Sequence, residues 1–427
     1  MSLTMDRAPK RKIHGLWWLP GVPGNRWTGT LTLRSGKFPR LKVIVPTGFF
    51  KLPKSAEIGV LFGRDLSDRP ITLFKSLAPA SQAGVFGTQL TFSPGYVVLG
   101  GEFASMEEFK VNEIEVAMQH LFEWSCMSGF AHDPPSGKAP SSVVIEHRLP
   151  TEHAVEISPG LQLRLRPRRV VSTAIRRYKI EEDVVATFVW QSAVPFKNAL
   201  ESVHSLRHLL HFSLIRPVFP ISLHAQINGV GNQLEEHFIP DKFEIFSSFL
   251  KKYPAPEFDP TRWIFRLPDI QESLRRFLSD WFRYVTQYEE SINCYFTTIY
   301  HQLPHSLEHL SLTQALDAYH GVKFRSHSKG GFEAKVREII EPKMPHLKGL
   351  VEDPGDFAKS VVHNRNYYTH HNPKWLTDGR IVSGANLYRM NEVLKYVFQM
   401  SVLEDIGIDK NRFNRLRQRM AVSVVEL

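Results

Sequence analysis

The sequence predicts an α+β protein, in which a β-rich N-terminal domain and a mixed middle region precede an all-α C-terminal domain. Up to about residue 190, short β-prone runs alternate with Gly and Pro turns. These runs are 41–45, 96–99, 142–145 and 184–190. Helical periodicity enters at 196–214, next to a strand-like run at 221–227. Beyond a proline-rich stretch at 253–260, nearly all of the chain follows a helical pattern.

The length of 427 residues suits two or three domains. We expect a basic tail at 1–12, an N-terminal domain at 13–252, a linker at 253–267 and a helical domain at 268–427. The linker contains three prolines, and neither they nor the residues before them can sustain a helix. Trp17, Trp18 and Trp124 are expected in the core, because large aromatic side chains dominate core burial.

Composition indicates a protein of a reducing compartment. No apolar run approaches the roughly 20 residues that a membrane helix needs, and residues 1–12 lack the apolar stretch of a secretory signal. The two cysteines, Cys126 and Cys294, fall one in each large domain, which argues against a disulfide scaffold. The net charge of +10 favours polyanionic partners such as RNA.

Two clusters concentrate the positive charge. In 161–166, basic residues alternate with leucines at the period of a half-buried strand, so the arginines should line one exposed face. Such a face is usually only solvated, although a phosphate backbone could lie along it. This first cluster contains Arg164, Arg166, Arg168, Arg169, Arg176, Arg177 and Lys179. The second is the better candidate for RNA binding, and it contains Arg412, Arg415, Arg417 and Arg419.

Several common chemistries lack their sequence signals. There is no GxxxxGK[ST] loop, no GxGxxG after a strand, no GxSxG elbow and no compact acidic set for two magnesium ions. Histidines at helical spacing could suit zinc, but no third ligand follows in a familiar order, so we expect ordinary core or surface histidines. These are His204, His208, His211, His305 and His309. We expect no metal and no cofactor.

One short segment, 365–370, combines an arginine, an amide and an imidazole on a predicted helix. His370 lies roughly 140° around the helix and about 7.5 Å along it from Arg365. Asn366 is four residues from His370, so its amide is predicted to orient the ring. The helix should end before Pro373, which leaves the segment at an accessible edge. His371 is an alternative catalytic histidine, although it points to another side of the helix.

The pattern of Arg, a polar residue, three spacers and His resembles the signature of HEPN domains, a helical superfamily that contains many ribonucleases. The run 311–320 resembles the first HEPN helix of ApeA-like antiphage proteins, with Asp317 where that family usually has glutamate. The helical period of 387–403, which closes at Gly407, resembles the last long helix of that domain. Runs with Gly, Trp and Leu at 15–21, 29–33 and 121–124 resemble blocks of the ApeA N-terminal domain.

The resemblance implies an all-α HEPN bundle and a metal-independent endoribonuclease that uses the 2′-hydroxyl of RNA as nucleophile. His370 would serve as general base or acid, Arg365 would stabilise phosphoryl charge, Asn366 would orient the imidazole or a phosphate oxygen, and Asp317 would hold Arg365. The products would be a 2′,3′-cyclic phosphate and a 5′-hydroxyl. HEPN ribonucleases typically pair, so a homodimer through this domain is expected.

The same resemblance implies a role in abortive infection, in the cytoplasm of a bacterium. The N-terminal half would sense a phage-derived trigger and restrain or release the nuclease. An alternative is a non-catalytic HEPN module that binds a nucleotide or RNA, or another protein, under the control of a partner, because fold does not determine function.

Overall fold

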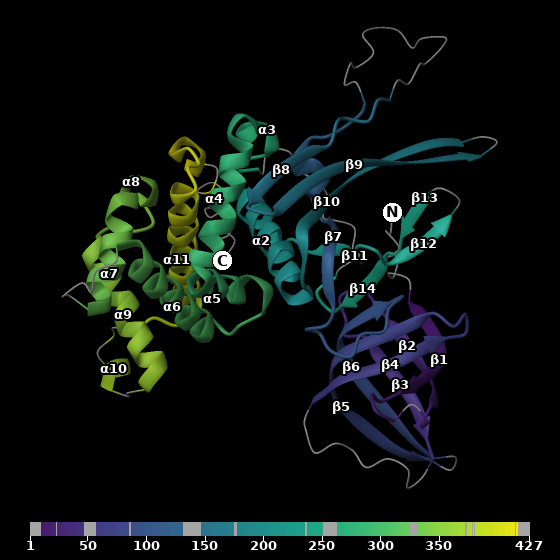
Figure 1. Cartoon of the computed structure of the whole chain (residues 1–427). Coiled ribbons are helices and arrows are strands. Elements are labelled where there is room, and N and C mark those ends of the chain that lie inside the picture. The colour runs from purple at the N-terminus through teal and green to yellow at the C-terminus, as the bar shows by residue number, and fades with distance from the viewer. Residues whose placement is uncertain are drawn as a thin grey trace. The chain divides into compact units, whose positions relative to one another are not determined.

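A computed structural model describes residues 10–22, 24–46, 57–84, 87–130, 147–174, 177–234, 237–250, 263–324, 331–371, 374–377, 379, 381–414 and 416. The chain divides into two compact units. The N-terminal unit comprises Met1–His208 and Val218–Phe258, and the helical unit comprises Leu209–Pro217 and Asp259–Leu427. The predicted α+β fold class is confirmed, with strands followed by helices (Figure 1). The four predicted domain limits remain predictions.

The described strands of the N-terminal unit are antiparallel to their neighbours (Figure 1). They are β1 (Arg11–Trp18), β2 (Trp27–Leu33), β3 (Arg40–Val45), β4 (Glu57–Asp65), β5 (Pro70–Gly84), β6 (Gly87–Leu99), β7 (Lys110–Met118), β8 (His153–Ser158), β9 (Leu161–Ala174), β10 (Arg177–Pro195), β11 (Pro220–Gln226), β12 (Gly231–Leu234), β13 (His237–Pro240) and β14 (Phe243–Ser247). Two helices accompany them, α1 (Leu121–Ser125) and α2 (Phe196–Leu214).

The first six strands close into a small barrel. Their order is β3-β2-β1-β4-β5-β6, and β3 also pairs with β6, which joins the two ends of the series. The far end of β6 continues into a second set of strands, in the order β14-β11-β7-β10-β9-β8. Strand β6 belongs to both the barrel and the second set of strands. Its first half pairs with Leu41–Val45 of β3, and its last four residues pair with β14.

The barrel interior is apolar because side chains alternate between its two faces. In β3 the burial pattern is strictly exposed then buried, and Leu41, Val43 and Val45 are the buried residues that belong to the barrel core. Trp17, fully buried as predicted, fills the centre of this core. Gly63 makes room for it, since a Cβ there would stand 2.3 Å from the indole ring.

The second set of strands packs around an aromatic cluster. Phe109 contacts Phe103, Phe196 and Phe243 with ring centroids 4.3–6.2 Å apart. Trp124 of α1 is fully buried, as the sequence predicted. Strands β12 and β13 form a separate two-stranded ladder.

Most of the predicted elements of this unit are confirmed. The helix predicted at 196–214 is α2, and the runs at 41–45, 96–99, 184–190 and 221–227 lie in β3, β6, β10 and β11. The predicted run 142–145 lies outside the described residues, as does most of the tail at 1–12. Along β9, Leu163 and Leu165 are buried, so its predicted alternation is confirmed.

The arginines of β9 are paired with carboxylates. Arg166 lies 2.9 Å from Glu152, and Arg168 lies 3.3 Å from Glu115 and 3.2 Å from Asp183. These acidic groups already neutralise Arg166 and Arg168. The first basic cluster is therefore less favourable for binding a phosphate backbone than its sequence suggests.

Acid should destabilise the fold through His204. Burial, with Arg207 nearby, lowers the pKa of His204 from 6.5 to about 3. Between these values the unfolded chain binds a proton that the folded chain does not, so stability falls as the pH drops through this window, by up to about 1.4 kcal/mol per pH unit. Urea unfolding of wild type and His204→Gln between pH 8 and pH 5 measures the effect. The variant should lose less stability on acidification, and equal losses would contradict this assignment.

The helical unit contains the end of α2 and the helices that follow the proline-rich stretch (Figure 1). They are α3 (Leu267–Ile270), α4 (Leu274–Gln287), α5 (Glu289–Tyr300), α6 (His305–Phe324), α7 (Gly331–Ile340), α8 (Met344–Leu347), α9 (Pro354–His370), α10 (Lys374–Thr377) and α11 (Gly384–Asp405). Short 3-10 turns occur at Gln271–Ser273, Glu341–Lys343 and Lys410–Arg412.

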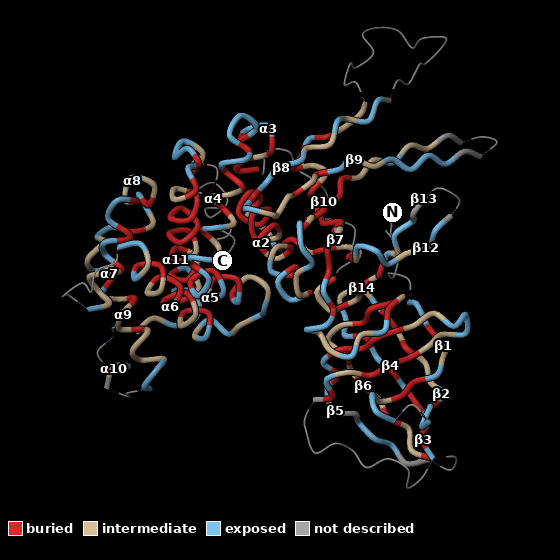
Figure 2. Tube along the Cα trace, in the orientation of Figure 1, coloured by how far each residue is buried: buried red, intermediate tan, exposed pale blue. Residues whose placement is uncertain are grey.

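Helix α11 is the central helix of this unit. It is buried on nearly every side between Val393 and Leu403 (Figure 2), as expected of a helix whose apolar residues cover its whole circumference. Gly407 adopts a φ of +81°, which glycine tolerates without strain, and thereby ends the helix as predicted.

Part of the predicted linker belongs to the core of the helical unit. Trp263, Ile264 and Phe265 are at most 1% exposed, and the Ile264 amide donates to the Ser213 carbonyl at 2.7 Å. Residues 253–262 lie outside the described part of the chain.

Candidate functional site

Helix α9 carries the Arg-Asn-x-x-x-His segment, and its first turn is well capped. The Asp353 carboxylate accepts from the amide of Asp356 at 2.8 Å, and Pro354 occupies the first turn. Ala358, Val361 and Asn364 recur every three residues on its buried face. Arg365 therefore lies beside the buried stripe and is only partly covered.

The helix ends where the sequence predicted. His370 is its last residue and His371 caps it with a φ of +50°. Both histidines are exposed. The His371 amide donates to the Tyr367 carbonyl, and its ring packs edge-on against that of Tyr367 at 5.8 Å. His370 has the freer position for contact with a substrate. Asn372 and Pro373 lie outside the described residues.

Two side chains of α9 hold the segment before α11. The fully buried Asn364 accepts from the Val382 amide at 3.0 Å, and its own amide donates to the Ser360 carbonyl. Tyr368 donates to the Val382 carbonyl at 2.9 Å. The backbone N–H and C=O of Val382 are thus both hydrogen-bonded to side chains of α9. These two bonds fix the C-terminal turns of the helix.

Replacing Asn364 by alanine should destabilise the helical unit by about 1–3 kcal/mol, since the partly buried Val382 amide loses its acceptor and the fully buried Asn364 side chain is removed. Urea unfolding measures the loss. Asn366→Ala is the matched control, because it removes the same side chain from a half-buried position of the same helix and should change stability by less than about 0.5 kcal/mol. Equal stabilities of the two variants would contradict the bridging role of Asn364.

The structure brings Arg365 together with side chains from two other helices. Its Nη2 lies 3.8 Å from Oδ2 of Asp317 on α6, and its guanidinium lies over the Phe332 ring of α7 at 4.5 Å from the centroid. The other oxygen of Asp317 accepts from Lys335 of α7 at 2.7 Å. About one third of the Arg365 side chain remains exposed, so donor groups are left for a ligand.

Lys335 and Phe332 are members of this cluster that the sequence analysis did not identify. The sequence gives no signal for them, because α7 lies 30 residues before the motif and carries no pattern that points toward it. Asp317, whose role rested on the family resemblance, does lie against Arg365. Among the described residues, no hydrogen bond joins the Asn366 amide to the His370 ring, so the structure does not contain the predicted orienting contact.

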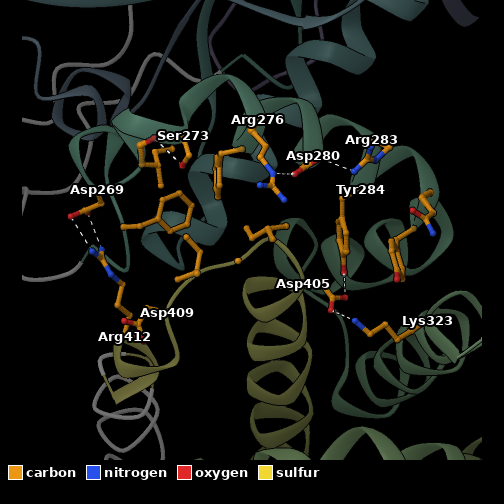
Figure 3. A pocket seen from close by; sticks show the side chains of 18 residues that line it. Asp269, Ser273, Arg276, Asp280, Arg283, Tyr284, Lys323, Asp405, Asp409 and Arg412 are labelled. Atoms are coloured by element: carbon orange, nitrogen blue, oxygen red, sulfur yellow. Dashed lines mark hydrogen bonds and ion pairs between the residues drawn. The ribbon is translucent and has the colours of Figure 1, made fainter.

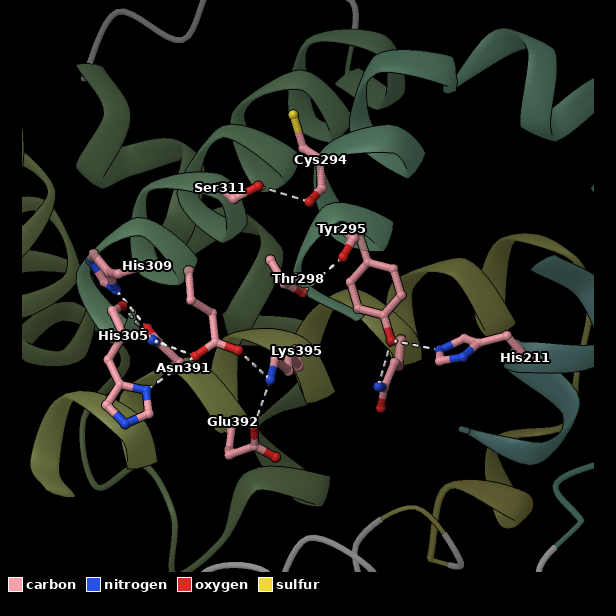
Figure 4. Close-up of polar contacts among 12 residues, drawn as sticks. His211, Cys294, Tyr295, Thr298, His305, His309, Ser311, Asn391, Glu392 and Lys395 are labelled. Atoms are coloured by element: carbon pink, nitrogen blue, oxygen red, sulfur yellow. Dashed lines mark hydrogen bonds and ion pairs between the residues drawn. The ribbon is translucent and has the colours of Figure 1, made fainter. Parts of the chain in front are cut away.

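A polar network in the same unit is built around His309 and Asn391 (Figure 4). His309 of α6 contacts the Val361 carbonyl of α9 through Nε2 at 3.2 Å and Asn391 of α11 through Nδ1 at 3.0 Å. Burial lowers the pKa of His309, despite the hydrogen bonds to Asn391 and Val361. The Asn391 amide in turn donates to Glu308 and to the His305 carbonyl. One imidazole thus links α6, which carries Asp317, to α9, which carries Arg365, and to α11.

Lys395 completes this network (Figure 4). Its ammonium lies 2.6 Å from Glu308 and 2.8 Å from Glu392. Burial opposes its charge, but the two carboxylates outweigh that effect and raise the pKa of Lys395. Lys395 thus neutralises one of the two negative charges of Glu308 and Glu392.

The remaining histidines of the sequence analysis have separate environments. His211 contacts the Arg216 carbonyl and the Tyr295 hydroxyl (Figure 4), and His305 lies 3.5 Å from Glu308. Within the described part of the chain, no group of three or more His, Cys, Asp or Glu side chains is placed to hold a metal ion.

A pocket of about 610 Å³ lies elsewhere in the helical unit, next to the C-terminal end of α11 (Figure 3). Its charged groups already pair with each other. Asp405 binds Lys323 at 2.5 Å and accepts from Tyr284 and Tyr319. Burial, and then the Asp405 charge, raise the pKa of both tyrosines, so both remain neutral donors. The pocket contains none of the predicted catalytic residues.

Arg412, predicted to bind RNA, is part of this pocket (Figure 3). Its guanidinium lies 2.9 Å from Asp269 and donates to the Ile264 carbonyl at 3.0 Å. Arg412 therefore joins the segment after α11 to α3. Fewer of its N–H donors remain available for a phosphate. Arg415, Arg417 and Arg419 lie outside the described residues.

Two family models match the chain. Residues 12–281 match the ApeA N-terminal domain 1, and residues 310–412 match the Apea-like HEPN domain. The chain belongs to the ApeA family. The HEPN match of this ApeA-family protein includes Asp317, Arg365, Asn366, His370 and His371. No curated protein and no solved structure gives a significant match.

Membership of the ApeA family places the protein among antiphage proteins with a domain of the HEPN nuclease family. The N-terminal family match extends through the predicted linker into α4, so the boundaries of the sequence family and those of the compact units differ. Among the described residues, no helix combines the length and apolar character that a membrane span requires.

Proposed function

We propose that this ApeA-family protein is a metal-independent HEPN endoribonuclease that acts in antiphage defence by abortive infection. One observation carries the proposal: the end of α9 presents exposed His370 five residues after Arg365, whose guanidinium is held by Asp317 and Phe332. A fixed guanidinium and an accessible imidazole are the groups that cleavage through a 2′-hydroxyl requires.

In the proposed reaction the 2′-oxygen of a ribose attacks the adjacent phosphorus. An imidazole removes the 2′-hydroxyl proton, the bond to the 5′-oxygen of the next nucleotide breaks, and a second proton donor protonates that oxygen. The products are a 2′,3′-cyclic phosphate and a 5′-hydroxyl. Arg365 stabilises the charge on the non-bridging oxygens, because its planar fork can make paired charge-assisted bonds to them. DNA is not a substrate, since it lacks the nucleophile.

Lys335 extends this role. It shares the Asp317 carboxylate with Arg365, so the two cations and one carboxylate leave a net positive charge at the cluster. An incoming phosphate is attracted to that charge. Asn366, half-buried and one residue beyond Arg365, is proposed to contact a phosphate oxygen rather than the His370 ring.

A single α9 supplies one Arg365 and one His370, whereas the reaction needs both a base and an acid. A homodimer through the HEPN domain would complete the pair with the partner subunit's His370. Twofold dimers are also the commonest homo-oligomers. Sedimentation velocity should show a dimer, and a monomer that cleaves RNA at full rate on dilution would contradict this part of the proposal.

The N-terminal unit is proposed to sense a phage-derived trigger and to control the nuclease in the bacterial cytoplasm. The second candidate function is a regulated binding module, and the partly exposed Arg365–Asp317–Lys335 cluster favours it because that cluster can bind a phosphate without cutting. Exposed His370 favours the nuclease, since binding alone does not need an imidazole at this position.

Incubation with total cellular RNA in EDTA distinguishes the two functions. Wild type should cut the RNA without divalent metal, and His370→Ala should bind it without cutting. Equal cutting by both proteins would refute the role of His370, and binding without cutting by wild type, in the presence of phage lysate as well, would favour the binding module.

A further inference from the structure

The outer face of the barrel carries rows of side chains fixed by strand register. Lys12 of β1 pairs with Thr32 of β2, which pairs with Arg40 of β3. In the next row His14, Thr30 and Lys42 are paired in the same order, and Lys42 also pairs with Thr91 of β6. Intervening side chains such as Ile13, Leu31 and Leu41 are buried in the barrel core, so the rows face outward.

Five cations lie on these rows and just beyond them. We call them the barrel basic face, and they are Lys10, Lys12, Arg34, Arg40 and Lys42. All five are exposed, and none forms an ion pair with a carboxylate of the described part of the chain. The charge of Lys12, followed by slight desolvation and the charges of Arg34 and Lys42, lowers the pKa of Lys10. In contrast, Arg166 and Arg168 on β9 are neutralised by neighbouring acidic residues.

Hydroxyl and apolar groups adjoin the basic face. A groove of about 600 Å³ is lined by Lys42, Thr28, Thr30, Leu16 and Ile44, and also by Arg26, Arg64, Asp65 and Asp68. Arg64 pairs with Asp68 at 2.9 Å, so the cations of the groove that lie next to the basic face are Lys42 and Arg26. The apolar side chains Leu16 and Ile44 in this groove are 40% and 53% exposed. The groove thus combines cations, hydroxyl donors and an uncovered apolar floor.

From this geometry we infer that the barrel face binds a single-stranded nucleic acid. Cations two residues apart on one strand are about 7 Å apart, and those on β1 and β3 about 10 Å, so several phosphates can be contacted at once. Threonine hydroxyls donate to phosphate oxygens, and the apolar groove accepts an unpaired base. A double helix keeps its bases stacked inside and would leave Leu16 and Ile44 uncovered. Because β3 and β6 close the barrel, the rows are held rigidly.

Fluorescence anisotropy with a labelled 15-nucleotide single-stranded DNA tests this inference on the full-length protein. DNA serves as the probe because it has no 2′-hydroxyl, so binding is measured whether or not the protein cuts RNA. The variant Lys12→Glu/Lys42→Glu reverses two charges of the basic face. The control Lys110→Glu/Lys197→Glu makes the same charge change at exposed positions of β7 and α2.

We expect the first variant to raise the Kd at least about tenfold and the control to raise it less than about threefold. In Lys12→Gln/Lys42→Gln, the slope of log K against log salt should fall by about 1.4, since two phosphate contacts at about 0.7 each are lost. A Kd that rises equally in both charge-reversal variants, or no binding by wild type, would overturn the inference. Displacement of the DNA by polyglutamate as readily as by unlabelled DNA would indicate an acidic protein as the partner and would also overturn it.

Discussion

Replacing His370 by alanine is expected to lower the rate of RNA cleavage by about 10²–10⁴-fold, the usual contribution of a positioned proton-transfer group. His370 is exposed at the end of α9 and makes no hydrogen bond to another described residue, so the folding transition should not change. Single-turnover cleavage of a labelled RNA, together with thermal unfolding, measures both quantities on the same preparation.

His371→Ala is the matched control for this experiment. The two histidines are adjacent and equally exposed, but His371 packs against Tyr367 and adopts the left-handed conformation of the helix cap. We expect its removal to change cleavage less than about tenfold. The opposite result, in which His371→Ala is inactive and His370→Ala is active, would transfer the catalytic role to His371.

Replacing Arg365 by alanine is expected to lower cleavage by about 10²–10³-fold, as removal of one group that stabilises transition-state charge typically does. Lysine at this position should not restore the rate, because an ammonium lacks the planar fork and cannot lie on the Phe332 ring in the same way. Stability should fall by only about 1 kcal/mol or less, since the contacts with Asp317 and Phe332 are partly exposed.

Two variants of Asp317 test whether its carboxylate is needed to position Arg365 for cleavage. Asp317→Glu restores the residue that the ApeA family usually carries and should keep most of the activity. Asp317→Asn removes the charge that holds both Arg365 and Lys335, and should reduce the rate while leaving RNA binding intact or stronger.

If Arg365→Lys and Arg365→Ala both cleaved at the wild-type rate, the guanidinium would have no part in the reaction.

Local patterns in the sequence predicted much of the fold. The period of 196–214 coincides with α2, and Gly407 ends α11 because only a residue at ease with positive φ fits there. Trp17 and Trp124 are buried as their size predicts. The helical period, the helix end and the burial of large side chains depend on residues close together in the chain, so a single sequence is enough to predict them.

Contacts between distant segments could not be predicted in the same way. The closing pair of β3 and β6 joins strands about 50 residues apart, and no pattern in either strand encodes its partner. Glu152 and Asp183 neutralise the arginines of β9 only because register brings them together. At the candidate site, Phe332, Lys335 and Asn364 are set by helix packing, whereas Arg365 and His370 follow from spacing along one helix.

The chemistry of the cut ends tests the central claim most directly. RNA cleaved by the wild-type protein in EDTA should carry a 2′,3′-cyclic phosphate on one side of each break and a 5′-hydroxyl on the other, as mass spectrometry of the fragments would show. Fragments with a 3′-hydroxyl and a 5′-phosphate would mean that water, and not the ribose, attacks the phosphorus, and would contradict the proposed reaction of Arg365 and His370.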